Sequence, residues 1–223
     1  MPAKSALKKM MEKFSRDSGI DEYLEKNVES AGYGGFEIIT SPVGTRITIY
    51  VTKPGLVIGR RGIGIRELTE NLEKIFELQN LQISVFEVEI PEQNARIMCN
   101  RVAQTVARGT AFRRAAMWTV NAIMRSGALG AEIVIAGKLR SERSHTEKYK
   151  DGVVPKTGYP ATLTVREAVS DVKLKMGLYG IQVKIAIRDM VPPDMELIKD
   201  IEKERSEKER SEKEGVVVQD VKA

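Results

Sequence analysis

The amino-acid sequence predicts an α+β protein of two domains, residues 1–90 and 91–193, followed by a charged tail over residues 194–223. The first observation is that the apolar residues change their period along the chain, from helical spacing to the alternation of strands and back. The second is the length, because 223 residues suit one large domain or two smaller ones. The third is a content of 42% apolar and 30% charged residues, which is ordinary for a globular protein.

The N-terminal domain is expected to follow the order α-β-β-α-α-β. Apolar residues at helical spacing over residues 7–28, interrupted at Gly19, predict two short helices or one kinked helix. Alternating residues then predict two neighbouring strands, at 36–38 and 47–51, joined by a turn around Pro42-Val43-Gly44.

The rest of this domain contains a glycine-rich turn, a helix and a third strand. Residues 54–62 form an apolar step interrupted by glycines, and the stripe from Ile65 to Phe76 predicts a helix. A strand follows at 81–85, and the slipped alternation at Phe86, Val88 and Ile90 predicts a bulge.

In the second domain helices precede strands, so we expect helices packed on a mostly antiparallel sheet. One helix begins near Pro91, and Gly109 separates it from a second helix over residues 112–123. Strands are expected at 133–140, 162–174 and 181–188. The connection 141–161 has no clear period, and connections of that length are usually functional or disordered.

Basic residues are concentrated in the two predicted domains. The tail 194–223 holds seven Lys/Arg against ten Asp/Glu, which leaves 29 basic and 21 acidic residues, a net charge of +8, in the remaining 193. With a pI near 9.2, this favours a polyanionic partner, whether RNA, DNA or an anionic membrane. Only 5% of residues are aromatic, which disfavours a binder that stacks bases on rows of rings. The tail repeats Glu-Lys-Glu-Arg-Ser, so we expect an exposed helix or a disordered segment there.

Composition also excludes several kinds of protein. No apolar run approaches the roughly 20 residues of a membrane span, and no signal peptide is visible, so we expect a soluble cytoplasmic protein with no membrane partner. Cys99 and His145 are the only cysteine and histidine, which excludes an internal disulfide and a zinc site made from them. Cys99 is expected in a helix core and His145 in a polar loop, and we expect no metal, no cofactor and no catalytic residue.

Three groups of residues are candidates for nucleic-acid binding. The first is the loop Gly59-Arg60-Arg61-Gly62 with Arg66 on the following helix. Its glycines let the backbone approach a sugar-phosphate chain, and the helix start and the arginines add N–H donors and positive charge. Without other context, a tight turn with solvated arginines is the better interpretation of this pattern. In the order α-β-β-α-GxxG-α-β, however, it resembles a type II KH domain.

The second group lies on the predicted helix around residue 118. Steps of four, three and four place Arg114, Trp118, Asn121 and Arg125 on one stripe, with Arg113 beside it. Guanidinium and amide groups suit phosphate and ribose contacts. For Trp118 itself we expect packing under the sheet.

The third group is the basic exterior of the second sheet and its long connection. Alternation is expected to direct its basic side chains away from the core, where each phosphate contact adds to the salt dependence of binding. The candidates are Lys138, Arg140, Arg143, Lys148, Lys150, Lys156 and Arg166, with Lys173, Lys175, Lys184 and Arg188 as further members.

Several motifs in a fixed order give a more specific indication than any of these groups. They are Val57–Gly62, Phe112-Arg113-Arg114-Ala115, Ser126-Gly127-Ala128, Gly137–Ser141 and Gly180–Ile185. Through them the chain resembles, over residues 5–190, the family of the universal third protein of the small ribosomal subunit. Two features resemble archaeal rather than bacterial members of this family. They are the segment from Lys138 to Arg143 and the absence of a long extension without acidic residues.

The resemblance implies an N-terminal type II KH domain and a C-terminal α+β domain in the head of the small subunit. It implies binding to ribosomal RNA and neighbouring head proteins, beside the channel where mRNA enters. In bacterial members, basic residues matching Arg113 and Arg114 contact the incoming mRNA and assist its unwinding, and Met117 occupies a third basic position of that motif.

Our main hypothesis is therefore a non-enzymatic, RNA-binding constituent of the small ribosomal subunit. A DNA-acting lyase or nuclease is an alternative, because a lysine in a basic groove can form a Schiff base with an abasic sugar. Another alternative is a free KH-containing regulatory RNA binder.

Overall fold

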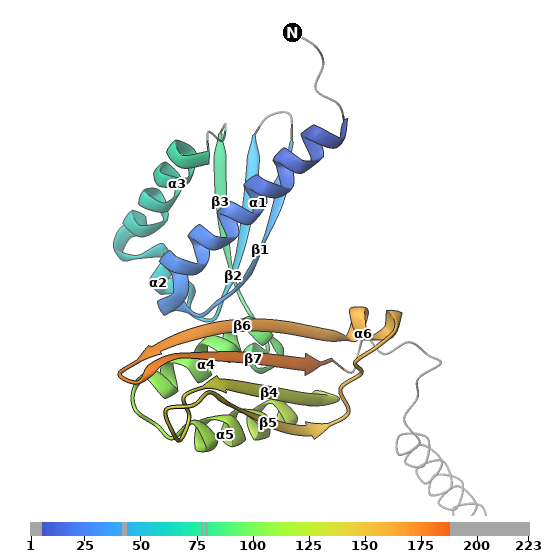
Figure 1. The fold of residues 1–223 in the computed structure, drawn as a ribbon. Coiled ribbons are helices and arrows are strands. Elements are labelled where there is room, and N and C mark those ends of the chain that lie inside the picture. Colours follow the sequence, from blue (N-terminus) through green and yellow to red (C-terminus); the bar gives the residue numbers. More distant parts are fainter. Residues whose placement is uncertain (1–5, 42–43, 77, 79, 188–223) are drawn as a thin grey trace, which may run out of the picture.

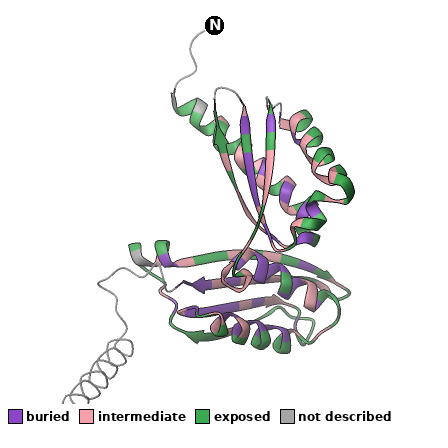
Figure 2. Cartoon of the chain, turned by 180° about the vertical axis from the view of Figure 1, so that it is seen from behind, coloured by how far each residue is buried: buried purple, intermediate pink, exposed green. Residues whose placement is uncertain are grey.

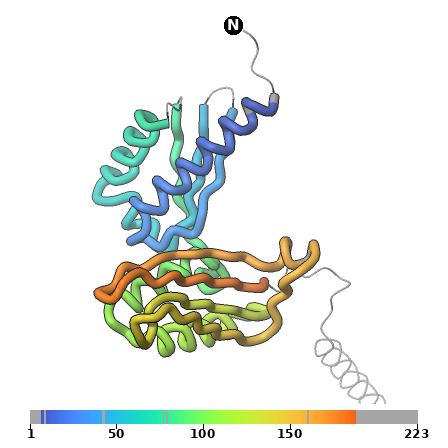
Figure 3. Tube along the Cα trace, in the orientation of Figure 1, coloured from blue at the N-terminus to red at the C-terminus, as the bar shows by residue number. Residues whose placement is uncertain are grey.

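The computed structural model describes residues 6–41, 44–76, 78 and 80–187. Within them the chain forms a three-stranded and a four-stranded sheet, each carrying helices (Figure 1), and it completes the first before it enters the second (Figure 3). The predicted α+β class is thereby confirmed. The domain boundary near residue 90 stays a prediction. Pro42, Val43, Arg188 and the tail 194–223 lie outside the described residues.

The first element is a single helix, α1 (Ala6–Val28), and not two short helices. It runs straight through Gly19, where an added Cβ would lie 3.0 Å from Cε1 of Phe76. Ile20 and Leu24, in its C-terminal half, are fully buried, whereas Leu7 and Phe14 in its N-terminal half are 75% and 62% exposed. Only half of the apolar stripe therefore contributes to the core.

The first sheet combines an antiparallel and a parallel pair. Strands β1 (Tyr33–Thr40) and β2 (Thr45–Val51) pair antiparallel, and β3 (Leu81–Glu87) pairs parallel to β2. The register between β2 and β3 is continuous and β3 ends at Glu87, so the expected bulge there was wrong. The sheet's register shift lies in β1, between Tyr33 and Gly35.

A helical crossover joins β2 to β3, as a parallel pair requires. It consists of α2 (Pro54–Ile58), a 3-10 turn (Arg60–Gly62) and α3 (Ile63–Phe76). Val57 and Leu72 of this crossover belong to one buried cluster with Ile47 and Ile49 of β2 and with Leu24. The predicted order α-β-β-α-α-β is therefore observed.

The second sheet is antiparallel throughout, in the order β5-β4-β7-β6. Its strands are β4 (Gly130–Gly137), β5 (His145–Gly152), β6 (Val165–Leu174) and β7 (Gly177–Ala186). Helix α4 (Ala95–Ala107) packs on β6 and β7, and α5 (Phe112–Arg125) packs on β4 and β5. Buried residues gather where these helices meet the sheet (Figure 2), and Cys99, whose pKa burial raises to about 12, lies among them.

Several elements of this half differ from those expected. The first predicted strand ends at Gly137 and not at residue 140, and a short helix, α6 (Tyr159–Thr164), occupies the start of the predicted strand at 162. The segment 141–161, expected to be irregular, contains β5. Because β5 is an edge strand with polar residues on both faces, it lacks the apolar alternation that identifies a strand.

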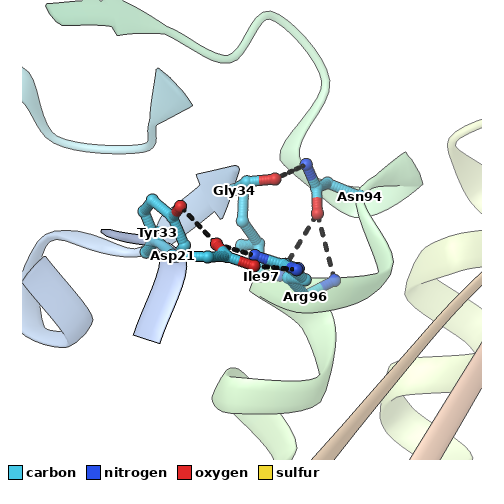
Figure 4. Close-up of polar contacts among 6 residues, drawn as sticks. All are labelled: Asp21, Tyr33, Gly34, Asn94, Arg96 and Ile97. Carbon is cyan, nitrogen blue, oxygen red and sulfur yellow. Dashed lines mark hydrogen bonds and ion pairs between the residues drawn. The ribbon is translucent and has the colours of Figure 1, made fainter. Parts of the chain in front are cut away.

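The two sheets are connected by a set of polar contacts at the start of α4 (Figure 4). The Asn94 side chain caps α4, its Oδ1 accepting from the backbone N–H of Arg96 at 3.0 Å, and its Nδ2 donates to the Gly34 carbonyl at 2.9 Å. Arg96 donates to both carboxylate oxygens of Asp21 on α1, which also accepts from the hydroxyl of Tyr33 at 2.7 Å. These contacts fix the position of α4 relative to the first sheet.

Candidate nucleic-acid interface

The loop Gly59–Gly62 is a tight turn that needs its glycines. Gly59 and Gly62 have φ of 70° and 74°, and the intervening Arg61 also lies in the left-handed region, with φ 55° and ψ 25°. A Cβ on Gly59 would approach the backbone nitrogen of Gly64 to 3.0 Å. The turn therefore packs closely against the backbone at Gly64 and depends on glycine at position 59.

Side chains around this loop point into solvent. Arg60, Arg61 and Arg66 are exposed, and the neighbouring Leu56 and Ile63 are 59% and 53% exposed. Charged groups and apolar surface are thus available together, which suits a partner with both phosphates and bases.

Residues 94–131 lie in the longest stretch of the chain without a carboxylate. They contain six arginines and no aspartate or glutamate, and they fold into α4 and α5. On α5 the residues Ala116, Val120 and Ile123 face the core, while Arg114 and Arg125 are exposed on the opposite side. The exposed side of this helix is therefore basic, as the sequence predicted.

Trp118 does not pack under the sheet, and that expectation was wrong. The side chain is 54% exposed, and the guanidinium carbon of Arg101 on α4 lies 5.3 Å from the centroid of its ring. The buried positions of α5 at residues 115, 116, 119, 120 and 123 already form a complete inner stripe. That stripe was the signal in the sequence that residue 118 lies on the outer side.

Arg113 and Arg140 share a carboxylate that the sequence did not reveal. Glu147 of β5, whose side chain is 12% exposed, lies 3.5 Å from Nη2 of Arg113 and 2.5 Å from Nη2 of Arg140, and it accepts from the hydroxyl of Tyr149. That hydrogen bond, followed by the charges of Arg140 and Arg113, holds the pKa of Glu147 below its ordinary value. The carboxylate is therefore ionised at neutral pH and offsets part of the charge of both arginines.

His145 also belongs to this neighbourhood. It opens β5 and does not lie in a loop, and its Nε2 is 3.9 Å from Oε1 of Glu147. Pairing of β5 with β4 sets Glu147 opposite Ile135, on the face covered by α5, and thereby brings the carboxylate to Arg113.

The lysines of β5 lie on the other face of the second sheet. Lys148 and Lys150 pair in register with Val134 and Glu132, whose side chains alternate with those of the core residues Ile133 and Ile135. Glu132 is 5% exposed and lies 3.4 Å from Nζ of Lys156. The exposed face thus carries lysines around one nearly buried carboxylate.

Four further candidates lie at two other places. Lys138, Arg140 and Arg143 follow the end of β4 and are not strand residues, so the alternation expected for them does not apply. Arg166 lines a hollow between the two halves, with Phe86 and Asn94. The structure therefore distributes the candidates over a loop, a helical face, a sheet face and this junction, and does not gather them in one groove.

Within the described ranges, no helix is long and apolar enough to cross a membrane. The same part of the chain contains no group of three or more His, Cys, Asp or Glu residues that could hold a metal ion.

Comparison with known proteins identifies both halves. Residues 19–93 match the family described as KH domain, and residues 102–185 match "Ribosomal protein S3, C-terminal domain". The chain is 45% identical over 179 residues to "Small ribosomal subunit protein uS3" of Methanothermobacter thermautotrophicus, covering 80% of this chain and 69% of that protein. It is 46% identical over 182 residues to the protein of the same name in Thermofilum pendens, covering 82% and 90%. These relatives are archaeal, as the sequence motifs suggested, and the chain therefore belongs to the family of small ribosomal subunit protein uS3.

Proposed function

We propose that this chain is a structural constituent of the small ribosomal subunit in the cytoplasm, where it binds ribosomal RNA and neighbouring proteins of the subunit head and lines the path of incoming mRNA. The relatives carry the name of such a constituent, and both halves match domains of that family. The role is structural and requires no catalytic residue.

The observation that carries the RNA-binding part of this proposal is the stretch of six arginines without a carboxylate over residues 94–131. Folded as α4 and α5, it leaves Arg114 and Arg125 exposed on the outer side of α5, and guanidinium groups bind phosphates with fixed geometry. The loop Gly59–Gly62 offers a second contact, through its glycine backbone and two exposed arginines.

For mRNA we assign Arg114 and Arg113 different roles. Arg114 is exposed on α5 and suits a direct phosphate contact. Arg113 lies beside Glu147, so its side chain is oriented by that carboxylate before any RNA binds. Lys148 and Lys150, on the opposite face of the sheet, suit ribosomal RNA or a protein neighbour.

Sedimentation of the native protein tests this function most directly. We expect it to co-sediment with small ribosomal subunits through a wash at moderate salt and to be absent from the free-protein fractions. A protein found only as a free species that still binds RNA would be a regulatory KH protein instead. A protein that binds neither subunits nor RNA contradicts the proposal altogether.

A further inference from the structure

The α4–α5 surface contains an aromatic side chain that phosphate binding does not require. Trp118 is the only tryptophan of the chain, and more than half of it, 54%, is exposed. Tryptophan is usually among the well-buried residues, because its ring contributes a large apolar area to a core. An indole exposed on the outer face of α5, beside the exposed Met117, therefore needs a reason.

The surroundings of Trp118 restrict what can cover it. On α5 it shares its stripe with Arg114, Asn121 and Arg125, all exposed, and Arg101 of α4 lies over its ring at 5.3 Å. Glu92 lies 3.6 Å from Nη1 of this arginine. The indole thus lies under one guanidinium and shares its helix face with exposed arginines, so a basic protein surface would be a poor complement to it.

We propose that Trp118, with Arg101 above it, forms a stacking site for one unpaired base of an RNA strand whose phosphates bind Arg114 and Arg125. An indole offers a π face to any base, and a guanidinium plane stacks on nucleobases as it does on rings. The neighbouring arginines supply the phosphate contacts at helix spacing. This inference rests on the proposed RNA-binding function and adds to it a preference for single-stranded over duplex RNA at this face.

Because Trp118 is the only tryptophan, its fluorescence reports on this site alone. The full-length protein is titrated with a fluorescently labelled oligoadenylate of about 12 nucleotides, within the site sizes of single-strand binders. Anisotropy of the label measures total binding, and indole emission measures contact at Trp118. We expect indole emission to be quenched in proportion to binding, whereas a duplex of equal length binds without quenching.

Variants separate stacking from charge. Trp118→Ala should weaken binding of the oligoadenylate at least about fivefold, the lower end for loss of one base stack, and Trp118→Phe should retain most of the affinity. Tyr159→Ala is the matched control, because Tyr159 is 74% exposed on α6 and we expect no change. Since Trp118 is at the surface, circular dichroism should show that its variants fold like the parent.

The outcomes distinguish the stacking site from the function on which it rests. If the anisotropy rises normally while indole emission stays constant and Trp118→Ala binds like the parent, the stacking site is wrong and RNA binding stands. If quenching occurs equally with duplex, the preference for unpaired bases is wrong. If the intact protein binds neither RNA, the proposed function fails, and the stacking site fails with it.

Discussion

Arg96 of α4 donates two hydrogen bonds, of 2.6 and 2.7 Å, to the two carboxylate oxygens of Asp21 on α1, although the residues are 75 positions apart. This paired geometry fixes distance and orientation together, and the hydroxyl of Tyr33 completes the coordination of the carboxylate. The contact joins the KH half to the arginine-rich half, so the relative position of the two elements proposed to bind RNA depends on it.

Removal of Arg96 should destabilise the protein measurably. In Arg96→Ala, Asp21 is left partly buried without its main partner, and we expect the free energy of unfolding to fall by about 1–2 kcal/mol, a range reduced for partial solvent screening. Urea denaturation measures this. Lys74→Ala is the control, because the Lys74–Glu70 pair is exposed, and its change should stay within about 0.5 kcal/mol. Equal effects in the two variants would contradict the role of Arg96.

The same contact should make stability depend on acid pH. Partial burial acts to raise the pKa of Asp21, but the hydrogen bonds from Arg96 and Tyr33 outweigh it and bring the pKa below the ordinary 3.8. A carboxyl group whose pKa is lowered by folding stabilises the fold fully above its unfolded pKa, and this contribution is lost as the pH falls through the folded pKa. The difference in unfolding free energy between the parent and Asp21→Asn should therefore be constant near neutral pH and shrink below 3.8. A difference that instead grows toward acid pH would mean that the sign is wrong.

Reversal of charge in the KH loop should weaken RNA binding. For Arg60→Asp with Arg61→Asp we expect a loss of at least ~1 kcal/mol and a lower slope of binding against salt concentration, because fewer counterions are released. Filter binding over a range of salt concentrations gives both quantities. Lys74→Asp, at the other end of α3, is the control for charge reversal away from the loop, although it changes the net charge by half as much. Unchanged affinity in the double variant would remove the loop from the interface.

Loss of the arginines on α5 should affect translation more than assembly. With Arg113→Ala and Arg114→Ala we expect initiation on structured messages to fall at least about fivefold, the equivalent of one charged contact of ~1 kcal/mol. Subunit assembly should change less. Reporter messages with and without a stable hairpin, together with subunit profiles, measure the two effects. Lys148→Ala with Lys150→Ala, on the other face of the sheet, should not reproduce the message dependence. Equal defects in initiation and assembly would argue against a contact with mRNA.

The sequence predicted the parts of this fold that depend on local periodicity. The order of elements up to β3, the two helices around Gly109 and the antiparallel second sheet followed from apolar spacing and from breaker residues. Strand β5 was missed because its residues are polar on both faces. Its stability comes from pairing with β4, a long-range interaction that no local pattern contains.

The sequence predicted the positive charge of the candidate site but not the contacts that its residues make. Runs such as Arg113-Arg114 are visible in the sequence, and the exposed basic face of α5 follows from helical spacing. The partners of these α5 residues are not visible, because Glu147, which pairs with Arg113, and Arg101, which lies over Trp118, come from other elements and meet them only after packing. The position of Trp118 was misjudged because its size suggested the core, although the spacing of its neighbours assigned it to the surface.

The positive stretch over residues 94–131 contains no lysine and no histidine. Guanidinium groups keep their proton far above physiological pH, and they are not substrates for acetylation. Neither a shift in cellular pH nor an acetyltransferase can therefore remove the positive charge of these arginines. The positive charge of these residues is therefore constant once the polypeptide has folded. A constant charge suits a protein that remains bound to a polyanion, and does not suit one whose binding is regulated.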